Sequence, residues 1–199
     1  VTALDIESRT EVLPFIEALH AEVSMPILYV SHSVDETLRL CDDLLVMDKG
    51  RKLAHGSLNE VLMQKGLPVL SGEEAGSVLA ATYDQYQADF GLTRVSVSGG
   101  TLLLPGELDA SRPIRVRVRA NDVSLSLTEA TDTSILNKLP AEVEAIDDDS
   151  PHSVLVRLRC GGEPLLARIT RRSLSELNIE AGARVIAQIK SVSVRAGKL

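Results

Sequence analysis

Residues Ile114–Arg119 have the sequence Ile-Arg-Val-Arg-Val-Arg, and this alternation decides the fold of most of the chain. Side chains two positions apart lie on the same face of a β-strand, so the pattern places the three apolar residues together on one face. The other face carries the arginines and meets water, which is typical of a strand in an antiparallel sheet. An anion-binding patch is the alternative explanation for the arginines, but a solvated strand face is the commoner one.

Short segments of strand-like composition extend on both sides of this stretch, from about Ser77 to the C-terminus. Residues 94–97 and 101–104 flank Ser-Gly-Gly, a combination that predicts a hairpin. Further strands are expected at 78–82, 123–127, 141–146, 154–158, 165–169, 185–189 and 192–194. Ser173 and Glu176 have the spacing of a capping box and predict a short helix near Leu177. Many short strands joined by turns predict an all-β domain, either a small barrel or a sandwich.

The first 66 residues have a different rhythm, which predicts an α/β segment. Val12, Phe15, Ile16, Leu19 and Val23 recur at helical spacing, with Pro14 inside the pattern as a kink or a late start. The apolar run 27–30 predicts a strand buried on both faces.

Two capping boxes and a turn organise the rest of this segment. Ser33 and Glu36 predict a helix that begins directly after His32, and Ser57 and Glu60 predict a second helix that reaches Met63. Between them, residues 44–47 are expected to form another buried strand, which turns at 49–50 into a hairpin partner at 51–55. Residues 67–76 have the composition of a linker. We therefore expect domains at 1–66 and 77–199, and we expect the second to fold without the first.

Composition excludes several classes of protein. The chain has 21 basic and 28 acidic residues, a net charge of -7, which argues against nucleic acid as the main partner. Cys41 and Cys160 are distant in sequence and form no C-x-x-C, so a reducing cytosol fits better than a disulfide framework. His55 and His152 have no companions at metal-ligand spacing, and we expect no metal site. No apolar run approaches the roughly 20 residues that span a bilayer.

His32 is the first candidate functional residue. It follows a predicted buried strand and precedes a predicted helix, which would place it at the carboxyl edge of a parallel sheet, where α/β proteins bind ligands. A histidine in that position can contact a γ-phosphate and the attacking water. A histidine that only makes a hydrogen bond within a loop is the structural alternative.

Three segments in order resemble ABC transporter ATPases. Residues 2–5 (Thr-Ala-Leu-Asp) look like the D-loop, 26–33 look like the strand that ends in the switch histidine, and 44–50 look like the hairpin that follows. The resemblance implies that His32 is the γ-phosphate switch and that Asp5 contacts nucleotide across a dimer, with ATP and Mg²⁺ as cofactors. Serine is usual in the family at Thr2.

The sequence contains no G-x-x-x-x-G-K-[ST] loop, which supplies the phosphate cradle in such ATPases. By the same resemblance, the Walker B aspartate and the catalytic glutamate would precede Val1. We therefore expect this chain to be a C-terminal piece of an ABC ATPase domain followed by the all-β domain, and to be inactive alone.

The all-β half is similar to the accessory domain of molybdate-importer ATPases. Residues 114–125 look like the R-x-x-D-V-x-L stretch of transport-associated (TOBE) barrels, and 133–140 together with 187–194 look like a molybdenum-pterin-binding (Mop-like) module. The resemblance implies an OB-like barrel with a Mop-like core at about 131–197. It also implies that the two Mop-like segments meet at an oxyanion site.

Donor side chains gather in these two segments. A tetrahedral dianion needs hydroxyl, amide or cationic donors and no nearby carboxylate. The residues of this kind are Thr133, Ser134, Asn137, Lys190, Ser191 and Ser193. The structural alternative is that they only make turns. Many relatives carry arginine where this chain has Leu136, which favours a weaker or regulatory site.

The combined resemblance implies the ATP-hydrolysing subunit of a molybdate importer, with an oxyanion-binding, dimerising C-terminal domain. The implied ligand is molybdate or tungstate. The implied partners are membrane permease subunits, an extracytoplasmic binding protein and a second copy, with the protein peripheral on the cytoplasmic face of the inner membrane. Two alternatives stay open: a non-catalytic molybdate sensor or storage protein, and the ATPase of a sulfate, iron or sugar importer with the same barrel.

Overall fold

The computed structural model describes residues 12, 13, 15, 16, 19, 26–62, 64, 67, 75–111, 114–129, 131–191 and 195–198. The D-loop-like residues 2–5, Pro14, most of the linker and Ser193 therefore lie outside the described residues. Of the predicted first helix, the described residues at 12, 13, 15, 16 and 19 are helical.

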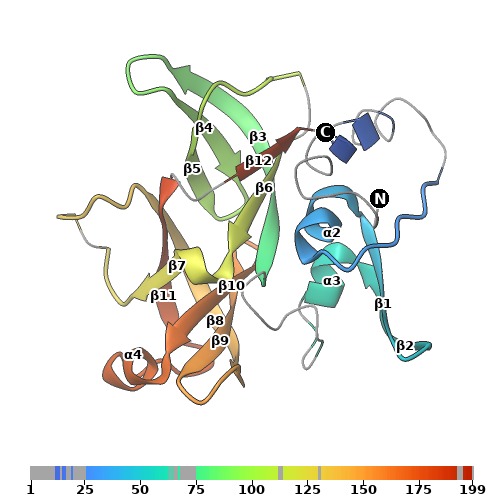
Figure 1. Cartoon of the computed structure of the whole chain (residues 1–199). Helices are drawn as coiled ribbons and strands as arrows, with labels where there is room; N and C mark the ends of the chain where they lie inside the picture. The colour runs from blue at the N-terminus through green and yellow to red at the C-terminus, as the bar shows by residue number, and fades with distance from the viewer. Residues whose placement is uncertain are drawn as a thin grey trace.

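Two five-stranded antiparallel sheets make up most of the molecule (Figure 1). The first sheet has the order β12-β6-β3-β4-β5 and the second has the order β10-β9-β8-β11-β7. The strands of the first are β3 (Gly76–Gln87), β4 (Leu92–Val97), β5 (Gly100–Pro105), β6 (Ile114–Arg119) and β12 (Arg195–Lys198). Those of the second are β7 (Val123–Ser126), β8 (Asn137–Asp148), β9 (Ser153–Cys160), β10 (Glu163–Thr170) and β11 (Arg184–Ile189). The prediction of an all-β domain of short strands is confirmed.

The two sheets are copies of one pattern. Each contains a 12-residue strand (β3 or β8), a hairpin (β4–β5 or β9–β10), a six-residue strand (β6 or β11) and a short last strand. A β-bulge interrupts the long strand of both, between Tyr83 and Gln85 in the first and between Val143 and Ala145 in the second. Counting back from the bulges makes Ser77 equivalent to Asn137. Their cross-strand partners Val118 and Ile189 are then equivalent too.

The last strand of each repeat crosses to the other sheet. β7 follows β6 through the 3-10 turn Ala120–Asp122 but pairs with β11, whereas β12 follows β11 in sequence but pairs with β6. Figure 1 shows this exchange in the colours, with red β12 beside the green strands and yellow β7 beside orange β11. The exchange ties the two repeats into one unit, since neither sheet is complete without a strand from the other.

Hydrogen bonds of Ser77 and Asn137, one on each long strand, close the junction between the repeats. The buried Ser77 hydroxyl accepts a hydrogen bond from the Leu166 N–H on edge strand β10, at 2.9 Å. The buried amide of Asn137 accepts from the Leu103 N–H at 2.7 Å and donates to the Leu103 carbonyl at 3.1 Å, on edge strand β5. Each long strand thus satisfies an edge strand of the opposite repeat, which leaves fewer unpaired backbone groups at the sheet edges.

The sequence alternation produces a shared core between the sheets. Ile114, Val116 and Val118 face inward and are at most 5% exposed, while the intervening arginines are half-buried. Val156, Leu158 and their neighbours on the second sheet pack against the same cluster. The apolar face of the Ile-Arg-Val-Arg-Val-Arg prediction is therefore confirmed. The prediction that the arginine face meets water is wrong, because the arginines are half-buried and Arg115 bonds the end of α2.

A small N-terminal unit packs on this β structure. It consists of α2 (Val34–Leu40), β1 (Asp43–Asp48), β2 (Arg51–Ser57) and α3 (Leu58–Leu62). The predicted capping box at α3 is present, with Ser57 N–H donating to Glu60 Oε2 at 2.9 Å and Glu60 N–H donating to Ser57 Oγ at 3.4 Å. The predicted hairpin of β1 and β2 is also confirmed.

This unit shares a core with the β domain. Val61 and Leu62 of α3 belong to one buried cluster with Leu155 and Leu166 of the second sheet. The expectation that residues after Ser77 fold alone stays a prediction. Such a fragment would expose Leu155 and Leu166.

Several local predictions in the N-terminal unit are wrong. Residues 26–30 form no strand, and Leu28 and Val30 are 89% and 79% exposed. A strand buried on both faces needs a paired strand on each side, and no described segment pairs with this one. Strand β1 does form, but Leu45 and Met47 are exposed, because β1 pairs with β2 alone in a two-stranded sheet.

The predicted cap at Ser173 is also misplaced. Helix α4 (Arg171–Glu176) begins earlier, and Thr170 Oγ1 accepts a hydrogen bond from Ser173 N–H at 3.0 Å. Ser173 is therefore the third helical residue and the donor to the cap. The Thr-x-x-Ser spacing satisfies the free N–H groups of the first turn as a Ser-x-x-Glu pair would.

The two hairpin turns at the junction make a testable close contact. A Cβ at Gly161, where φ is 56°, would lie 2.0 Å from the Ser98 carbonyl oxygen, whereas a Cβ at Gly91, where φ is 63°, would meet nothing within 4 Å. Both alanine variants carry left-handed strain of about 1–2 kcal/mol. Gly161→Ala must also displace the opposite turn, and we expect a further loss of about 1–3 kcal/mol. Urea unfolding measures both; equal losses for the two variants would contradict the contact between the repeats.

Candidate functional site

His32 lies in the loop before α2 and not at the edge of a sheet. Its side chain is exposed, and the strand predicted before it is absent, so the predicted placement at a parallel sheet edge is wrong for this structure. The loop itself is well held. Glu36 is buried and accepts hydrogen bonds from Tyr29 Oη at 2.9 Å and from Ser31 Oγ.

Ser33 caps α2, as its capping box predicts. Its Oγ accepts from Glu36 N–H at 3.3 Å, and its own N–H donates to Ser31 Oγ at 3.0 Å. These bonds fix the backbone on both sides of His32, so the imidazole projects from a rigid turn. Asp5, the other residue implied for nucleotide contact, lies outside the described residues.

The structure brings the two Mop-like segments together at one end of the second sheet. Asn137 begins β8 and pairs with Ile189 at the end of β11. The loop at 133–136 enters β8, and Lys190 and Ser191 leave β11, at this same end. Candidates from distant parts of the sequence thus become neighbours.

The candidates in this end of the sheet have different environments. Thr133 is half-buried, and its Oγ1 accepts from Ile135 N–H at 3.2 Å, so it also shapes the turn. Ser134 and Lys190 are exposed, as is Leu136 at 56%. Asn137 is 1% exposed and its amide is bonded to Leu103, which makes it an anchor of the fold. Ser193 lies outside the described residues.

Ser191 carries the most informative atom of this group. Its Oγ is buried and has no hydrogen-bond partner among the residues that the structure describes. A buried hydroxyl without a partner costs about 1–3 kcal/mol, so such groups are rare in folded proteins. The preceding residue, Lys190, has an exposed side chain. Hydroxyl donors and cations are the groups that an anion needs.

The equivalent end of the first repeat lacks this chemistry. Its positions equivalent to Lys190 and Ser191 are Arg119 and Ala120. Ala120 is fully buried, and its N–H donates to the Ala75 carbonyl at 2.8 Å. The carboxylate of Asp122 follows in the same turn, but the pairing of Val123 with Ile189 places Asp122 near Lys190 as well, so this carboxylate does not distinguish the two ends. What distinguishes the second end is the buried hydroxyl of Ser191 in place of the alanine.

Sequence reasoning missed a polar chain beside the site. Gln188 is 9% exposed, and its Nε2 donates to Ser126 Oγ at 2.9 Å, which in turn donates to the Thr128 carbonyl at 2.8 Å. Ser124 Oγ donates to the Gln188 carbonyl at 3.4 Å. These bonds hold β7 against β11 just before Lys190. The sequence pattern that could have revealed it is the alternation of Ser124 and Ser126 with apolar residues in the predicted strand 123–127.

Neither cysteine is suited to nucleophilic chemistry. Burial raises the pKa of the Cys160 thiol to about 12. Burial also raises the pKa of Cys41, although the nearby Arg115 guanidinium opposes the shift. Thiolates are therefore scarce at neutral pH.

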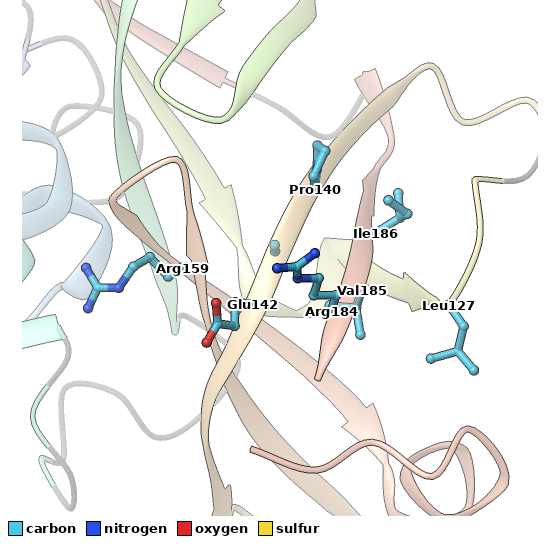
Figure 2. Close-up of a pocket in the computed structure, with 8 residues that line it drawn as sticks. Leu127, Pro140, Glu142, Arg159, Arg184, Val185 and Ile186 are labelled. Atoms are coloured by element: carbon cyan, nitrogen blue, oxygen red, sulfur yellow. The ribbon is translucent and has the colours of Figure 1, made fainter. Parts of the chain in front are cut away.

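The described part of the chain offers no other chemical centre. It holds no group of three His, Cys, Asp or Glu side chains placed to share a metal ion. Within the same residues, no helix combines the length and apolar character needed to cross a bilayer. An open groove of about 430 Å³ does lie on the second sheet (Figure 2), and none of the predicted site residues lines it.

Comparison with known proteins points in one direction. The TOBE domain family model matches residues 133–196. The chain is 45% identical over 196 residues to "Molybdenum import ATP-binding protein ModC" of Methylococcus capsulatus, covering 98% of this chain and 55% of that protein. It is 45% identical over 199 residues to the protein of the same name from Thiobacillus denitrificans, covering 98% and 54%. The chain thus spans about half the length of the curated relatives it matches.

A solved structure supports the fold. The cytoplasmic molybdate-binding protein ModG, crystallised with molybdate bound, matches with a TM-score of 0.50 and 22% identity, over 62% of this chain and 93% of that one. At this identity the match concerns the fold alone. It agrees with the two-sheet β architecture described above.

Proposed function

We propose that this chain belongs to the family of molybdenum import ATP-binding proteins and that the whole protein is the ATP-hydrolysing subunit of a molybdate importer. In this proposal residues 1–66 are the C-terminal part of a P-loop ABC ATPase domain, 67–76 are a linker and 77–199 are the TOBE/Mop-like domain. The protein works as a homodimer on the cytoplasmic face of the membrane. It acts on membrane permease subunits, to which an extracytoplasmic binding protein delivers molybdate.

The nucleotide chemistry of this proposal falls to few residues of the chain. ATP and Mg²⁺ supply the transferred phosphoryl group and its charge neutralisation. His32 contacts the γ-phosphate and the attacking water, and Asp5 contacts nucleotide from the opposite subunit. The rigid turn around His32, held by Ser31 and Ser33 on Glu36, supports a positioning role. Positioning is most of what a protein contributes to phosphoryl transfer.

The C-terminal domain binds molybdate or tungstate at the end of the second sheet. The observation that carries this proposal is the buried Oγ of Ser191, which has no partner among the described residues and which follows the exposed Lys190 in sequence. Thr133 and Ser134 supply further hydroxyls from the adjoining loop. Ser193, which lies outside the described residues, is proposed as a further hydroxyl donor. Asn137 remains one of the proposed site residues, in the role of an anchor for this loop, because its amide is hydrogen-bonded to the backbone of Leu103.

Local charge decides whether such a site can attract a dianion. The chain as a whole carries a net charge of -7, which repels one at long range. Lys138 and Lys190 lie at this end of the sheet together with the carboxylates of Asp122 and Asp132, so the local charges nearly balance. Screening removes the distant charges beyond roughly 10 Å. Leu136 is exposed at this end and adds no charge. We therefore propose a regulatory site of moderate affinity.

Molybdate titration tests the oxyanion site. Ser191→Ala and Lys190→Ala should each weaken binding about ten- to a hundredfold, because a charge-assisted hydrogen bond contributes about 1.5–3 kcal/mol. Ser191→Ala should leave the free energy of unfolding unchanged or slightly higher, since its hydroxyl has no hydrogen-bond partner among the described residues. Calorimetry and urea unfolding measure the two effects.

The matched controls are Ser96→Ala and Lys52→Ala, which make the same changes at exposed positions of other strands. Both controls should bind as the wild type does. The site would be refuted if the wild-type protein shows no binding at millimolar molybdate, or if Ser191→Ala binds molybdate with wild-type affinity. Sulfate, the smaller ion, should compete poorly.

Nucleotide assays test the ATPase half of the proposal. This chain contains no phosphate loop and should show no specific ATP-Mg binding in calorimetry. In the whole protein, His32→Ala should lower turnover by roughly a hundredfold and leave nucleotide binding nearly unchanged, because the histidine acts on the γ-phosphate in the transition state. His55→Ala, on an exposed hairpin, is the control. Wild-type turnover in His32→Ala would remove this residue from the mechanism.

A further inference from the structure

The groove on the second sheet is an exposed apolar surface with charged margins. It lies on the outer face of β8 and β11, where Figure 2 shows Pro140, Glu142, Arg184 and Ile186 on the two neighbouring strands. Leu127 closes one end and is 53% exposed. The groove is shallow and open, so it fits a protein surface better than an enclosed small molecule.

Two opposite charges in this groove have no partner. Glu142 and Arg184 lie directly opposite each other in the register of β8 and β11, yet no ion pair joins either to another side chain in the described part of the chain. Arg159, at the margin, is different. Its guanidinium pairs with Glu144 and donates to the Gly162 carbonyl at 3.3 Å. The uncommitted charges of the groove therefore sum to zero.

The equivalent face of the first repeat is already an interface. Register equivalence places Arg115 at the position of Ile186, and Ala80 at the position of Pro140. The Arg115 guanidinium donates to the Cys41 carbonyl at 2.8 Å and to Asp42 Oδ1 at 3.1 Å, at the end of α2. Helix α2 lies against β3 and β6 there. This face of the repeat is thus covered by the chain itself in one copy, whereas no described segment fills the groove in the other.

We propose that the groove is the surface through which two copies of this chain associate. A two-fold axis through the groove sets the apolar side chains of Leu127, Pro140 and Ile186 against the same residues of the other copy. Arg184 then meets the partner's Glu142, and the symmetry makes that pair twice. The dimer itself belongs to the function proposed above; the surface and its two charge pairs are the addition.

Charge favours a second copy over another kind of partner. Two copies of a chain with a net charge of -7 repel each other over most of their surfaces. The groove carries one acidic and one basic side chain without an ion-pair partner, so it is complementary to a second copy of itself. The repulsion between the two negatively charged chains is therefore absent at this surface. A basic or an acidic partner would each leave one of the two charges opposed.

Charge reversal and its restoration test this surface. In sedimentation equilibrium without molybdate, the wild-type chain should form a reversible dimer. Glu142→Arg and Arg184→Glu should each weaken dimerisation by about tenfold or more, because each places like charges together at two symmetric sites. The double variant exchanges the signs of both partners and should return to within about threefold of the wild type. Glu142 and Arg184 also face each other within one chain, so the double variant restores that internal contact as well. An equimolar mixture of the two single variants restores opposite charges only between copies, and it should dimerise where neither variant does alone.

Asp89→Arg, an equal charge reversal in the exposed turn between β3 and β4, is the control and should dimerise as the wild type does. A wild-type chain that stays monomeric at every concentration would overturn the proposal. So would a dimer that is insensitive to both single variants, or a double variant no better than the single ones. A chain that fails to bind molybdate but follows the predicted dimer pattern would refute the oxyanion site and support the groove.

Discussion

The architecture depends on how the start of each long strand is satisfied by the other repeat. Ser77 and Asn137 are buried polar side chains at equivalent positions, and each one bonds a backbone group on the opposite edge strand. A buried polar group without such a partner would cost more than a typical hydrogen bond contributes. These bonds therefore fix the relative position of the sheets, and the exchange of β7 and β12 ties the same two repeats together.

Equivalent backbone positions have taken on different chemistry. At the end of β11, Ser191 keeps a buried hydroxyl that the fold does not use, whereas at the end of β6 the equivalent Ala120 is packed and its N–H is bonded. The outer faces differ in the same way, since Arg115 holds the end of α2 while the face around Ile186 is open. The first repeat holds the end of α2, and both repeats contribute to the core beneath α3. The outer face and the end of the second sheet are left with surfaces available to ligands and partners.

Features that depend on residues close together in the sequence were predicted correctly. Features that depend on contacts between distant residues were not. The alternation in Ile114–Arg119, the hairpin at 98–100 and the capping box at Ser57 are local, and the structure has all three. The strand at 27–30 failed because its burial depends on neighbouring strands. Asn137 was chosen as a ligand for its amide, which the fold uses to bind Leu103. The repeat was missed because equivalent positions hold unlike residues, such as serine at one and asparagine at the other.

Hydrogen exchange at two amides tests the central role of the Ser77 and Asn137 bonds most directly. The N–H groups of Leu103 and Leu166 lie on edge strands, where exposed amides exchange quickly, but both are bonded by buried side chains across the junction. If these bonds hold the repeats together, both amides should exchange as slowly as the amides of core strands such as β8, through global unfolding only. Fast exchange at either amide in the intact chain would show that the repeats open independently and would contradict the account.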